Sequence, residues 1–385
     1  MARIDHFSVS GFKSIRNVDK FELGPVTILI GDNGTGKSNL LSFFNMFAAL
    51  SQERLQEFVH DEGGPDALLF GGRKHTSRIQ AGLSFNNNNC EYEFSLESKD
   101  NSLIFSHEKT IPGIESDDDD ADLSYLDFLI GGYRTDNEAS VWPGGNKETF
   151  LAKTHESLFT SYVLPQMKSW QIFHFQNMCH TARVRNHSDI CDNLWLKPDA
   201  SNLSLNLFYL KEKYPNHYRR IVQVTNVFAP FFVDFVLNGE NSTRDSLQLE
   251  WYHASGGQES LYSPQQLSDG LLRFICLSTL LNQPHSMQPS LILIDEPELG
   301  LNPYALALLS EMIQSAANYK QVIISTQSPE LINNFDPQDI VVVSRQNDET
   351  VLDRLDLDRL DIWFENHSLG DLWKMNVIGS RPLPC

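Results

Sequence analysis

The amino-acid sequence predicts an α/β fold built on a parallel sheet with helices on both faces, together with a smaller antiparallel sheet. In the last third of the chain, short apolar runs (LILIDEP, QVIISTQ and IVVVSR) alternate with a helical segment at 304–317. Such alternation is typical of parallel strands that are joined by crossover helices. Closer to the N-terminus, residues 77–110 alternate apolar and polar side chains, which predicts an antiparallel meander.

The remaining elements follow from the same two periodicities. Residues 4–15 and 21–30 predict two strands, and apolar side chains between Ser38 and Leu50 recur at helical spacing. We expect a Gly-rich loop over 61–72 and an exposed acidic loop over 113–122. Helices are expected over 150–168, 201–225 and 267–282, and a strand pair over 231–253.

Length and charge narrow the class of protein. The 385 residues suggest two to three units, and Lys+Arg 30 against Asp+Glu 50 gives a net charge of −20. Such an acidic surface repels nucleic acid on average, so DNA binding would need a local basic groove. We expect no membrane contact, since no apolar run approaches the roughly 18 residues of a span. Scattered cysteines without a CxxC motif predict a reducing, cytoplasmic location.

The segment GDNGTGKS at 31–38 has the pattern of a phosphate-binding loop. Its glycines allow backbone N–H groups to surround phosphate oxygens, and the following helix contributes the positive end of its dipole. We expect Lys37 to reach the β- and γ-phosphates of ATP and the Ser38 hydroxyl to coordinate Mg²⁺. The residues expected to form the cradle are Asn33, Gly34, Thr35 and Gly36. A predicted strand before the loop and a predicted helix after it support this interpretation.

A second element ends in two carboxylates. Four apolar residues, 291–294, precede Asp295 and Glu296. A buried strand with acids at its carboxyl end suits one task, in which Asp295 holds Mg²⁺ and Glu296 polarises the attacking water. The alternative is an ordinary buried strand followed by acidic helix-capping residues, and the phosphate loop in the same chain argues against it.

The spacing between these elements indicates a large insertion. Lys37 and Asp295 are 258 residues apart, and LSDG at 267–270 lies shortly before Asp295. Ser268 and Gly270 at the start of a predicted helix form a second candidate anion site. Because the chain's own phosphates already have a cradle, this second site is understandable if it closes on a nucleotide held by a partner chain.

Taken together, LSDG, GFKSIRN, GDNGTGKS, IDEPELGLNP and STQSP resemble the ATPase heads of the SMC and RecF group. The chain is most similar to stand-alone bacterial ABC-class ATPases of this group that occur in anti-phage defence loci. The resemblance implies an ABC-type ATPase head with a parallel core sheet, an antiparallel β subdomain and a helical insert that carries the signature motif. It divides the chain into an N-terminal lobe (1–150), a helical insert lobe (151–285) and a C-terminal lobe (286–385).

The resemblance also implies roles for individual residues. Lys13 and Ser14 would lie near the ribose or α-phosphate, and Ser268 and Gly270 would touch the γ-phosphate across a dimer. Glu298, Leu299 and Gly300 would form the loop that crosses between protomers. Gln176 is the candidate for sensing Mg²⁺ and water, although His174 is an equally placed polar residue on the same predicted strand.

Three positions depart from the family pattern. Asp269 stands where transporters carry Gly, and Asn302 stands where His is frequent after the crossing loop. Gln327 occupies the switch-histidine position as a candidate catalytic residue. An amide can bond the γ-phosphate but cannot accept a proton, so we expect slow hydrolysis.

The expected function is therefore an ATPase that forms a head-to-head homodimer through its ATP sites. It would control a separate effector, a nuclease or toxin-like protein from a neighbouring gene, in anti-phage defence. The alternative is a RecF-like repair ATPase that binds DNA directly; a transporter motor fits the DEPELGLNP form less well. Two basic clusters are candidates for DNA contact or for solvated faces: Arg73, Lys74, His75 and Arg78, and Lys211, Lys213, Arg219 and Arg220.

Overall fold

The computed structural model describes residues 3–86, 90–112, 140–142, 144–151, 162–189, 195–237 and 246–378. The predicted acidic loop at 113–122 lies outside these residues. The chain divides into two compact units. Unit 1 comprises residues 1–24, 32–170 and 343–353, and unit 2 comprises residues 25–31, 171–342 and 354–385.

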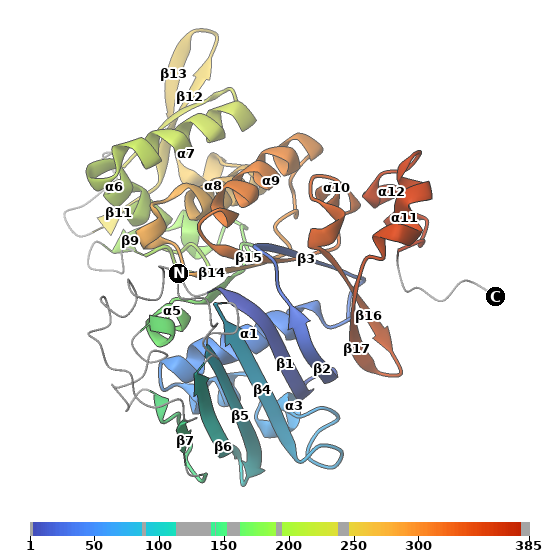
Figure 1. Cartoon of the computed structure of the whole chain (residues 1–385). Helices are drawn as coiled ribbons and strands as arrows, with labels where there is room; N and C mark the ends of the chain where they lie inside the picture. Colours follow the sequence, from blue (N-terminus) through green and yellow to red (C-terminus); the bar gives the residue numbers. More distant parts are fainter. Residues whose placement is uncertain are drawn as a thin grey trace, which may run out of the picture. The chain divides into compact units, whose positions relative to one another are not determined.

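Unit 1 contains a six-stranded antiparallel sheet in the order β2-β1-β4-β5-β6-β7 (Figure 1). Its strands are β1 (Ile4–Phe12), β2 (Ile15–Glu22), β4 (Arg78–Phe85), β5 (Cys90–Lys99), β6 (Ser102–Pro112) and β7 (Ser140–Trp142). The predicted meander over 77–110 is confirmed. The single strand predicted over 21–30 is wrong, because β2 ends at Glu22 and the next strand starts at Val26. Gly24 and Pro25 interrupt the ladder, since proline has no N–H to donate.

One face of this sheet forms an aromatic core with helix α1 (Lys37–Ser51). Phe43 is fully buried and its ring lies 5.5 Å from Phe7, 5.3 Å from Phe44 and 5.2 Å from Phe47. Two short helices, α2 (Leu55–Asp61) and α3 (Pro65–Leu68), follow α1, so the predicted loop over 61–72 contains a helical turn that begins at Pro65.

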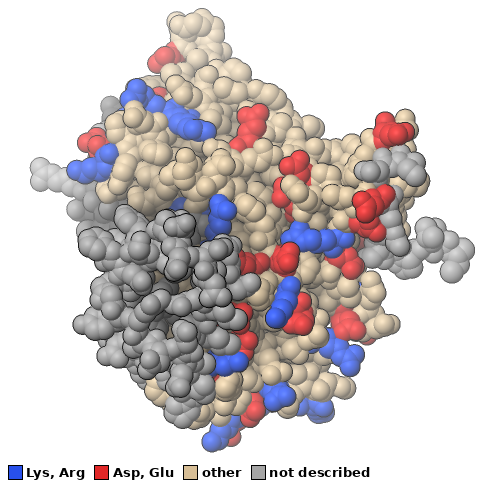
Figure 2. Space-filling view, in the orientation of Figure 1, with Lys and Arg blue, Asp and Glu red and all other residues tan. Residues whose placement is uncertain are grey.

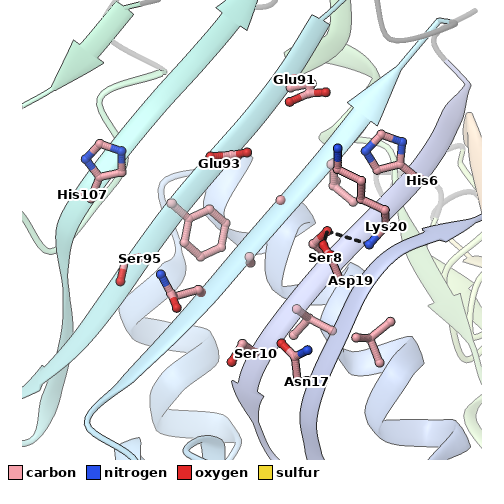
Figure 3. A pocket seen from close by; sticks show the side chains of 17 residues that line it. His6, Ser8, Ser10, Asn17, Asp19, Lys20, Glu91, Glu93, Ser95 and His107 are labelled. Carbon is pink, nitrogen blue, oxygen red and sulfur yellow. Dashed lines mark hydrogen bonds between the residues drawn. The ribbon is translucent and has the colours of Figure 1, made fainter. Parts of the chain in front are cut away.

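The opposite face of the sheet is polar, as period-2 alternation requires. Figure 3 shows His6, Lys20, Glu91, Glu93 and His107 projecting from neighbouring strands around a shallow hollow. The described residues contain no group of three or more His, Cys, Asp or Glu side chains arranged to hold a metal ion. The sheet of unit 1 thus has one polar face and one apolar face.

Unit 2 is built on parallel strands in the order β16-β3-β15-β14-β8. These strands are β3 (Val26–Ile30), β8 (Gln171–Phe173), β14 (Leu291–Asp295), β15 (Gln321–Thr326) and β16 (Ile340–Gln346). Strand β17 (Glu349–Arg354) is the sheet neighbour of β16. In the register of the core strands, Asp295 lies opposite Ser325, and Thr326 lies opposite Ile30. The carboxyl ends of β14, β15 and β3 therefore meet at one edge.

Four longer helices form a layer in unit 2 (Figure 1). They are α6 (Leu203–Lys213), α7 (Pro215–Phe228), α8 (Asp269–Asn282) and α9 (Pro303–Ala317), with α7 packed on α8, α8 on α9, and α9 on β15 and β3. The helix predicted over 201–225 is two helices, because Pro215 starts a new one. No helix in the described part of the chain has both the length and the apolar character that crossing a bilayer requires.

Smaller elements complete unit 2. The predicted strand pair over 231–253 is confirmed as β10 (Phe232–Val236) and β12 (Glu250–Ser255), to which β13 (Gln258–Tyr262) adds an unpredicted third strand. β9 (Ser188–Asp189) pairs with β11 (Ser246–Leu247). The short helices of unit 2 are α10 (Pro329–Ile332), α11 (Leu357–Phe364) and α12 (Leu369–Lys374). In unit 1, α5 (Leu164–Met167) coincides with the last residues of the helix predicted over 150–168.

Truncation of Phe43 tests the aromatic core of unit 1. We expect Phe43→Ala to lower the free energy of unfolding by about 3–5 kcal/mol, because the cavity left among close-packed rings cannot collapse. Phe231→Ala is the matched control, since Phe231 is 42% exposed, and it should cost less than about 1 kcal/mol. Urea unfolding followed by circular dichroism measures both values, and equal losses would contradict the packing described.

Candidate functional site

The predicted phosphate loop begins directly after β3 and leads into α1, whose first residue is Lys37. Gly34 and Gly36 have φ values of 79° and 108°, the left-handed region that glycine adopts without strain. A Cβ on Gly36 would lie 2.0 Å from Thr350 Oγ1 and 2.8 Å from Ser14 Oγ. Only glycine therefore fits at this turn.

The Lys37 side chain folds back onto the backbone of the phosphate loop. Lys37 is 5% exposed and its Nζ donates to the Asp32 carbonyl oxygen at 3.0 Å. Thr35 Oγ1 donates to the same carbonyl at 2.9 Å. Asn33, Gly34 and Ser38 are exposed. This arrangement closes the loop and leaves its outer rim and the Ser38 position open to a ligand.

Lys13 and Ser14 lie beside α1 in unit 1. Lys13 Nζ is 2.8 Å from both Ser42 Oγ and Glu62 Oε2, so an ion pair already balances its charge. Ser14 Oγ accepts a hydrogen bond from Asn39 Nδ2 at 2.6 Å and lies 2.7 Å from Thr350 Oγ1. These contacts fix both predicted residues at the side of the phosphate loop.

A cavity of about 770 Å³ borders this part of unit 1, and Lys13, Ser14, Asn39 and Arg345 all line it. Arg345 Nη1 donates to the Gly34 carbonyl oxygen at 3.3 Å. Sequence analysis did not single out Arg345, which follows the apolar residues 340–343 and Ser344 in β16. Its contact with the loop depends on the turn between β16 and β17, which the sequence pattern does not specify.

Asp295 is the last residue of β14 and is 8% exposed. Its Oδ2 lies 3.6 Å from His174 Nδ1, and its buried Oδ1 has no hydrogen-bond partner among the described residues. A buried carboxylate oxygen without a partner is costly unless a ligand supplies the missing contact. A hard divalent cation such as Mg²⁺ prefers such an oxygen, so this donor fits the predicted metal.

Glu296 follows in a left-handed conformation with a φ of 48°, and its N–H donates to the Ser325 carbonyl oxygen at 2.8 Å. Its Oε1 accepts a hydrogen bond from Gln327 Nε2, and its Oε2 accepts one from Gln176 Nε2 at 3.4 Å. Two amides therefore aim the carboxylate. The structure brings together three of the predicted residues at this point.

The placement of His174 and Gln176 on one strand is wrong. Strand β8 ends at Phe173, and both residues lie in the segment that follows it. The N–H of His174 donates to the Pro198 carbonyl oxygen at 3.2 Å, which takes this segment away from the sheet ladder. As a result, His174 approaches Asp295 and Gln176 approaches Glu296, so the two side chains are not interchangeable.

The loop after Glu296 carries the predicted crossing residues. The Glu298 carboxylate accepts the backbone N–H of Gln327 at 2.8 Å, while burial raises the pKa of this carboxyl above its usual value. Leu299 and Gly300 are exposed. Asn302 is the N-cap of α9, and its Oδ1 accepts the N–H of Ala305 at 2.8 Å. Asn302 therefore has a capping role.

The predicted signature residues open α8. Ser268 is the N-cap, and its Oγ accepts the N–H of Leu271 at 3.2 Å. A Cβ on Gly270 would lie 2.4 Å from the Gly300 carbonyl oxygen, so a side chain there would displace the crossing loop. Asp269 pairs with Arg185 at 2.6 Å. Arg185 is 1% exposed, and this buried partner explains the Asp269 departure.

Arg273 connects these parts, although sequence analysis gave it no role. It is 6% exposed and donates to the carbonyl oxygens of Phe175 at 2.6 Å and Gln176 at 2.9 Å. A third hydrogen bond reaches the Leu299 carbonyl oxygen. One guanidinium thus ties α8 to the segment of Gln176 and to the crossing loop. The detectable signal is a single cation within the apolar run from 271 to 281.

Comparison with solved structures identifies the fold. A crystal structure of an SMC head bound to the C-winged helix domain of ScpA has a TM-score of 0.55 at 16% identity, covering 92% of this chain and 99% of that one. An SMC head with an extended coiled coil, bound to the C-terminal domain of ScpA from Pyrococcus furiosus, has a TM-score of 0.54 at 13% identity, covering 95% and 99%. At these identities the likeness shows the fold alone.

Two curated relatives match short segments. A putative ABC transporter ATP-binding protein from Methanosarcina acetivorans is 33% identical over 81 residues, 21% of this chain and 28% of that protein. A DNA replication and repair protein RecF from Paenarthrobacter aurescens (strain TC1) is 43% identical over 53 residues, 14% of this chain and 13% of that protein. The chain therefore matches less than a third of each relative's length.

A protein family covers far more of the sequence. The family described as "AAA domain, putative AbiEii toxin, Type IV TA system" matches residues 26–333. That range includes the loop that follows β3, the helix opened by LSDG and the carboxylates at the end of β14. The chain belongs to this AAA domain family, and its fold is similar to that of SMC heads.

Proposed function

We propose that the chain binds ATP with Mg²⁺ and hydrolyses it slowly in a head-to-head homodimer, whose opening and closing controls a separate effector protein. One observation carries the ATPase part of this proposal. The carboxyl ends of β3, β15 and β14 are in register in unit 2, and they lead respectively into the phosphate loop, Gln327 and the Asp295–Glu296 pair. In open α/β sheets, ligands bind at this edge.

The side chains divide the chemistry between them. Lys37 and the N–H groups of the 33–36 cradle would bind and orient the phosphates. Ser38 and Asp295 would hold Mg²⁺, which neutralises charge on the phosphate oxygens when bound. Lys13 and Ser14 would contact the ribose or α-phosphate.

Glu296 would take the proton from the attacking water, because its carboxylate is aimed by the amides of Gln176 and Gln327. Gln327 cannot accept a proton, and its Nε2 already occupies one oxygen of the base. Both properties favour slow turnover, in line with the sequence-based prediction.

Ser268 and Gly270 would complete the nucleotide site of a partner copy. Ser268 is exposed at the start of α8, and Leu299 and Gly300 of the crossing loop are exposed beside Gly270. These residues are therefore accessible to a second protomer. The dipole of α8 adds a positive end for the γ-phosphate.

We further propose that the effector is a nuclease or toxin-like protein from a neighbouring gene, acting in anti-phage defence in the cytoplasm. The family description, which names a toxin–antitoxin system, supports this context. The described cysteines, Cys90, Cys179 and Cys276, are unpaired thiols, which suits a reducing compartment. A repair ATPase that binds DNA directly is the second candidate, and the short RecF match supports it.

Removal of the loop cation tests nucleotide binding. We expect Lys37→Ala to weaken ATP binding at least a hundredfold, because the phosphates lose their main fixed cation, whereas Lys99→Ala on the exposed end of β5 should leave affinity unchanged. Equilibrium binding of a fluorescent ATP analogue measures both variants. Wild-type affinity in Lys37→Ala would contradict the phosphate-loop assignment.

Neutralisation of the candidate base separates binding from turnover. Glu296→Gln should bind ATP normally and hydrolyse it at least a hundredfold more slowly, because an amide cannot take the proton. In ATP it should elute as a dimer, and without ATP as a smaller species. The control is Glu311→Gln, since Glu311 is exposed on α9. Wild-type turnover in Glu296→Gln would show that another group is the base.

A mixture of two inactive variants tests whether the signature acts across the dimer. Ser268→Arg and Lys37→Ala should each abolish hydrolysis. In a mixed dimer, the trans arrangement puts both lesions in one site and neither in the other, so activity should recover to about half of normal. If both elements serve the same chain's nucleotide, every site carries one lesion. If demonstrated heterodimers neither recover hydrolysis nor trap ATP in a single site, the trans arrangement is excluded. Trapping is measured as well as hydrolysis because two strictly cooperative sites could leave one intact site unable to turn over alone.

A further inference from the structure

A cavity of about 470 Å³ lies in unit 2 where the start of α7 meets the last residues of α8 and α9. Its volume is typical of small-molecule sites. Ser268 and Gly270 lie at the opposite end of α8, whose 14 residues span roughly 21 Å. The cavity is therefore separate from the signature residues at the start of α8.

None of the described residues that line this cavity is Asp or Glu. Arg220 is exposed and forms no hydrogen bond or ion pair with the described residues. His217 and His285 also line the cavity. The cation on Arg220 therefore faces a space without a counter-charge.

The hydrogen bonds of the two histidines fix which nitrogen remains for a ligand. His217 Nδ1 lies 2.8 Å from the Asn282 carbonyl oxygen, so Nδ1 donates. His285 Nδ1 lies 3.2 Å from Gln288 Oε1, while Gln288 Nε2 donates to the Leu280 and Leu281 carbonyl oxygens. Nδ1 of His285 is therefore also the donor, and Nε2 of both rings is left for other contacts.

The same contacts satisfy carbonyl oxygens at the carboxyl end of α8. The carbonyl oxygens of Leu280, Leu281 and Asn282 all accept side-chain donors. At the same place, α7 begins at Pro215 and contributes the positive end of its dipole. The last residues of α9 border the same cavity and contribute a negative dipole end. The full positive charge of Arg220 is therefore the feature that favours an anion here.

The cavity also offers an aromatic surface. Tyr319 stacks on His285 with ring centroids 4.0 Å apart, and Tyr319 is 58% exposed. Gln283 lines the cavity at 2% exposure, and its Oε1 is buried without a hydrogen-bond partner among the described residues. A planar ring would stack on the exposed Tyr319 ring, next to Gln283.

We propose that this cavity binds a nucleoside phosphate, with its base on Tyr319 and near Gln283 and its phosphate at Arg220. The ligand is a free nucleotide or one unit of a single strand, since the bases of a duplex are stacked and unavailable. Figure 2 shows further Lys and Arg side chains on the surface formed by α6 and α7, where α6 carries Lys211 and Lys213. This basic surface could carry the neighbouring phosphates of a strand.

The two sources are distinguished with two probes on the full chain. A labelled 20-nucleotide oligo-dT is titrated by fluorescence anisotropy, and AMP and dTMP are titrated calorimetrically in the Lys37→Ala background, where the phosphate loop is disabled. If the oligonucleotide binds in an Arg220-dependent way and the mononucleotides do not bind, the ligand is a single strand. Arg220-dependent binding of the mononucleotides assigns a free nucleotide. Both results support the site, and its outcome does not depend on whether ATP hydrolysis occurs.

Adjacent residues supply the controls. Arg220→Glu should weaken binding about tenfold. Arg219→Glu makes the same change of charge one residue away and should leave binding nearly unchanged, because Arg219 is bonded to Asn216 Oδ1 and the Pro215 carbonyl oxygen. Tyr319→Ala should weaken binding roughly tenfold, as lost base stacking does, and Tyr252→Ala should not. If Arg220→Glu fails to fold, Arg220→Gln replaces it. Binding of neither probe, or equal losses at Arg219 and Arg220, would overturn the proposal.

Discussion

The arrangement of the candidate catalytic residues in unit 2 depends on one buried cation. Arg273 is almost fully enclosed, and a guanidinium in such a position is costly unless its donors are satisfied. Backbone carbonyl oxygens of Phe175, Gln176 and Leu299 satisfy them. Loops are ordinarily the most variable parts of a fold. Here two loops and the first turns of α8 share one charged group, so none of the three can move without breaking bonds to it.

In unit 1, contacts from residues distant in sequence hold the phosphate loop in a tight turn that has no space for a side chain at Gly36. Gly36 leaves no room for a side chain beside Thr350 and Ser14, and Arg345 bonds the carbonyl oxygen of Gly34. The hairpin of β16 and β17 therefore supports the phosphate loop from residues far away in sequence. Lys13 is kept neutralised by Glu62. These contacts restrict the loop before any nucleotide arrives, which lowers the entropic cost of binding.

The sequence predicted most of the strands and helices because periodicity and motif are local properties. The meander, α1, α8, α9 and the core parallel strands follow from residues within a few positions of one another. The errors have local causes too: Pro25 divides a predicted strand, and Pro215 divides a predicted helix. In contrast, the partners of Arg185, Arg273 and Arg345 lie up to 311 residues away. No period in the sequence specifies such pairs, although an isolated cation in an apolar helix marks a residue that must find one.

The left-handed backbone conformation of Glu296 affects which substitutions at this position would stabilise the chain. A φ of 48° costs most residues that have a Cβ roughly 1–2 kcal/mol, whereas glycine, which has none, and asparagine, whose short side chain can bond locally, adopt it more readily. Glu296 is held there by its carboxylate bonds to Gln176 and Gln327 and by the backbone bond to Ser325. Directed evolution for heat resistance alone would therefore favour replacing this glutamate. A lineage that retains it accepts a less stable scaffold in exchange for a carboxylate at the end of β14.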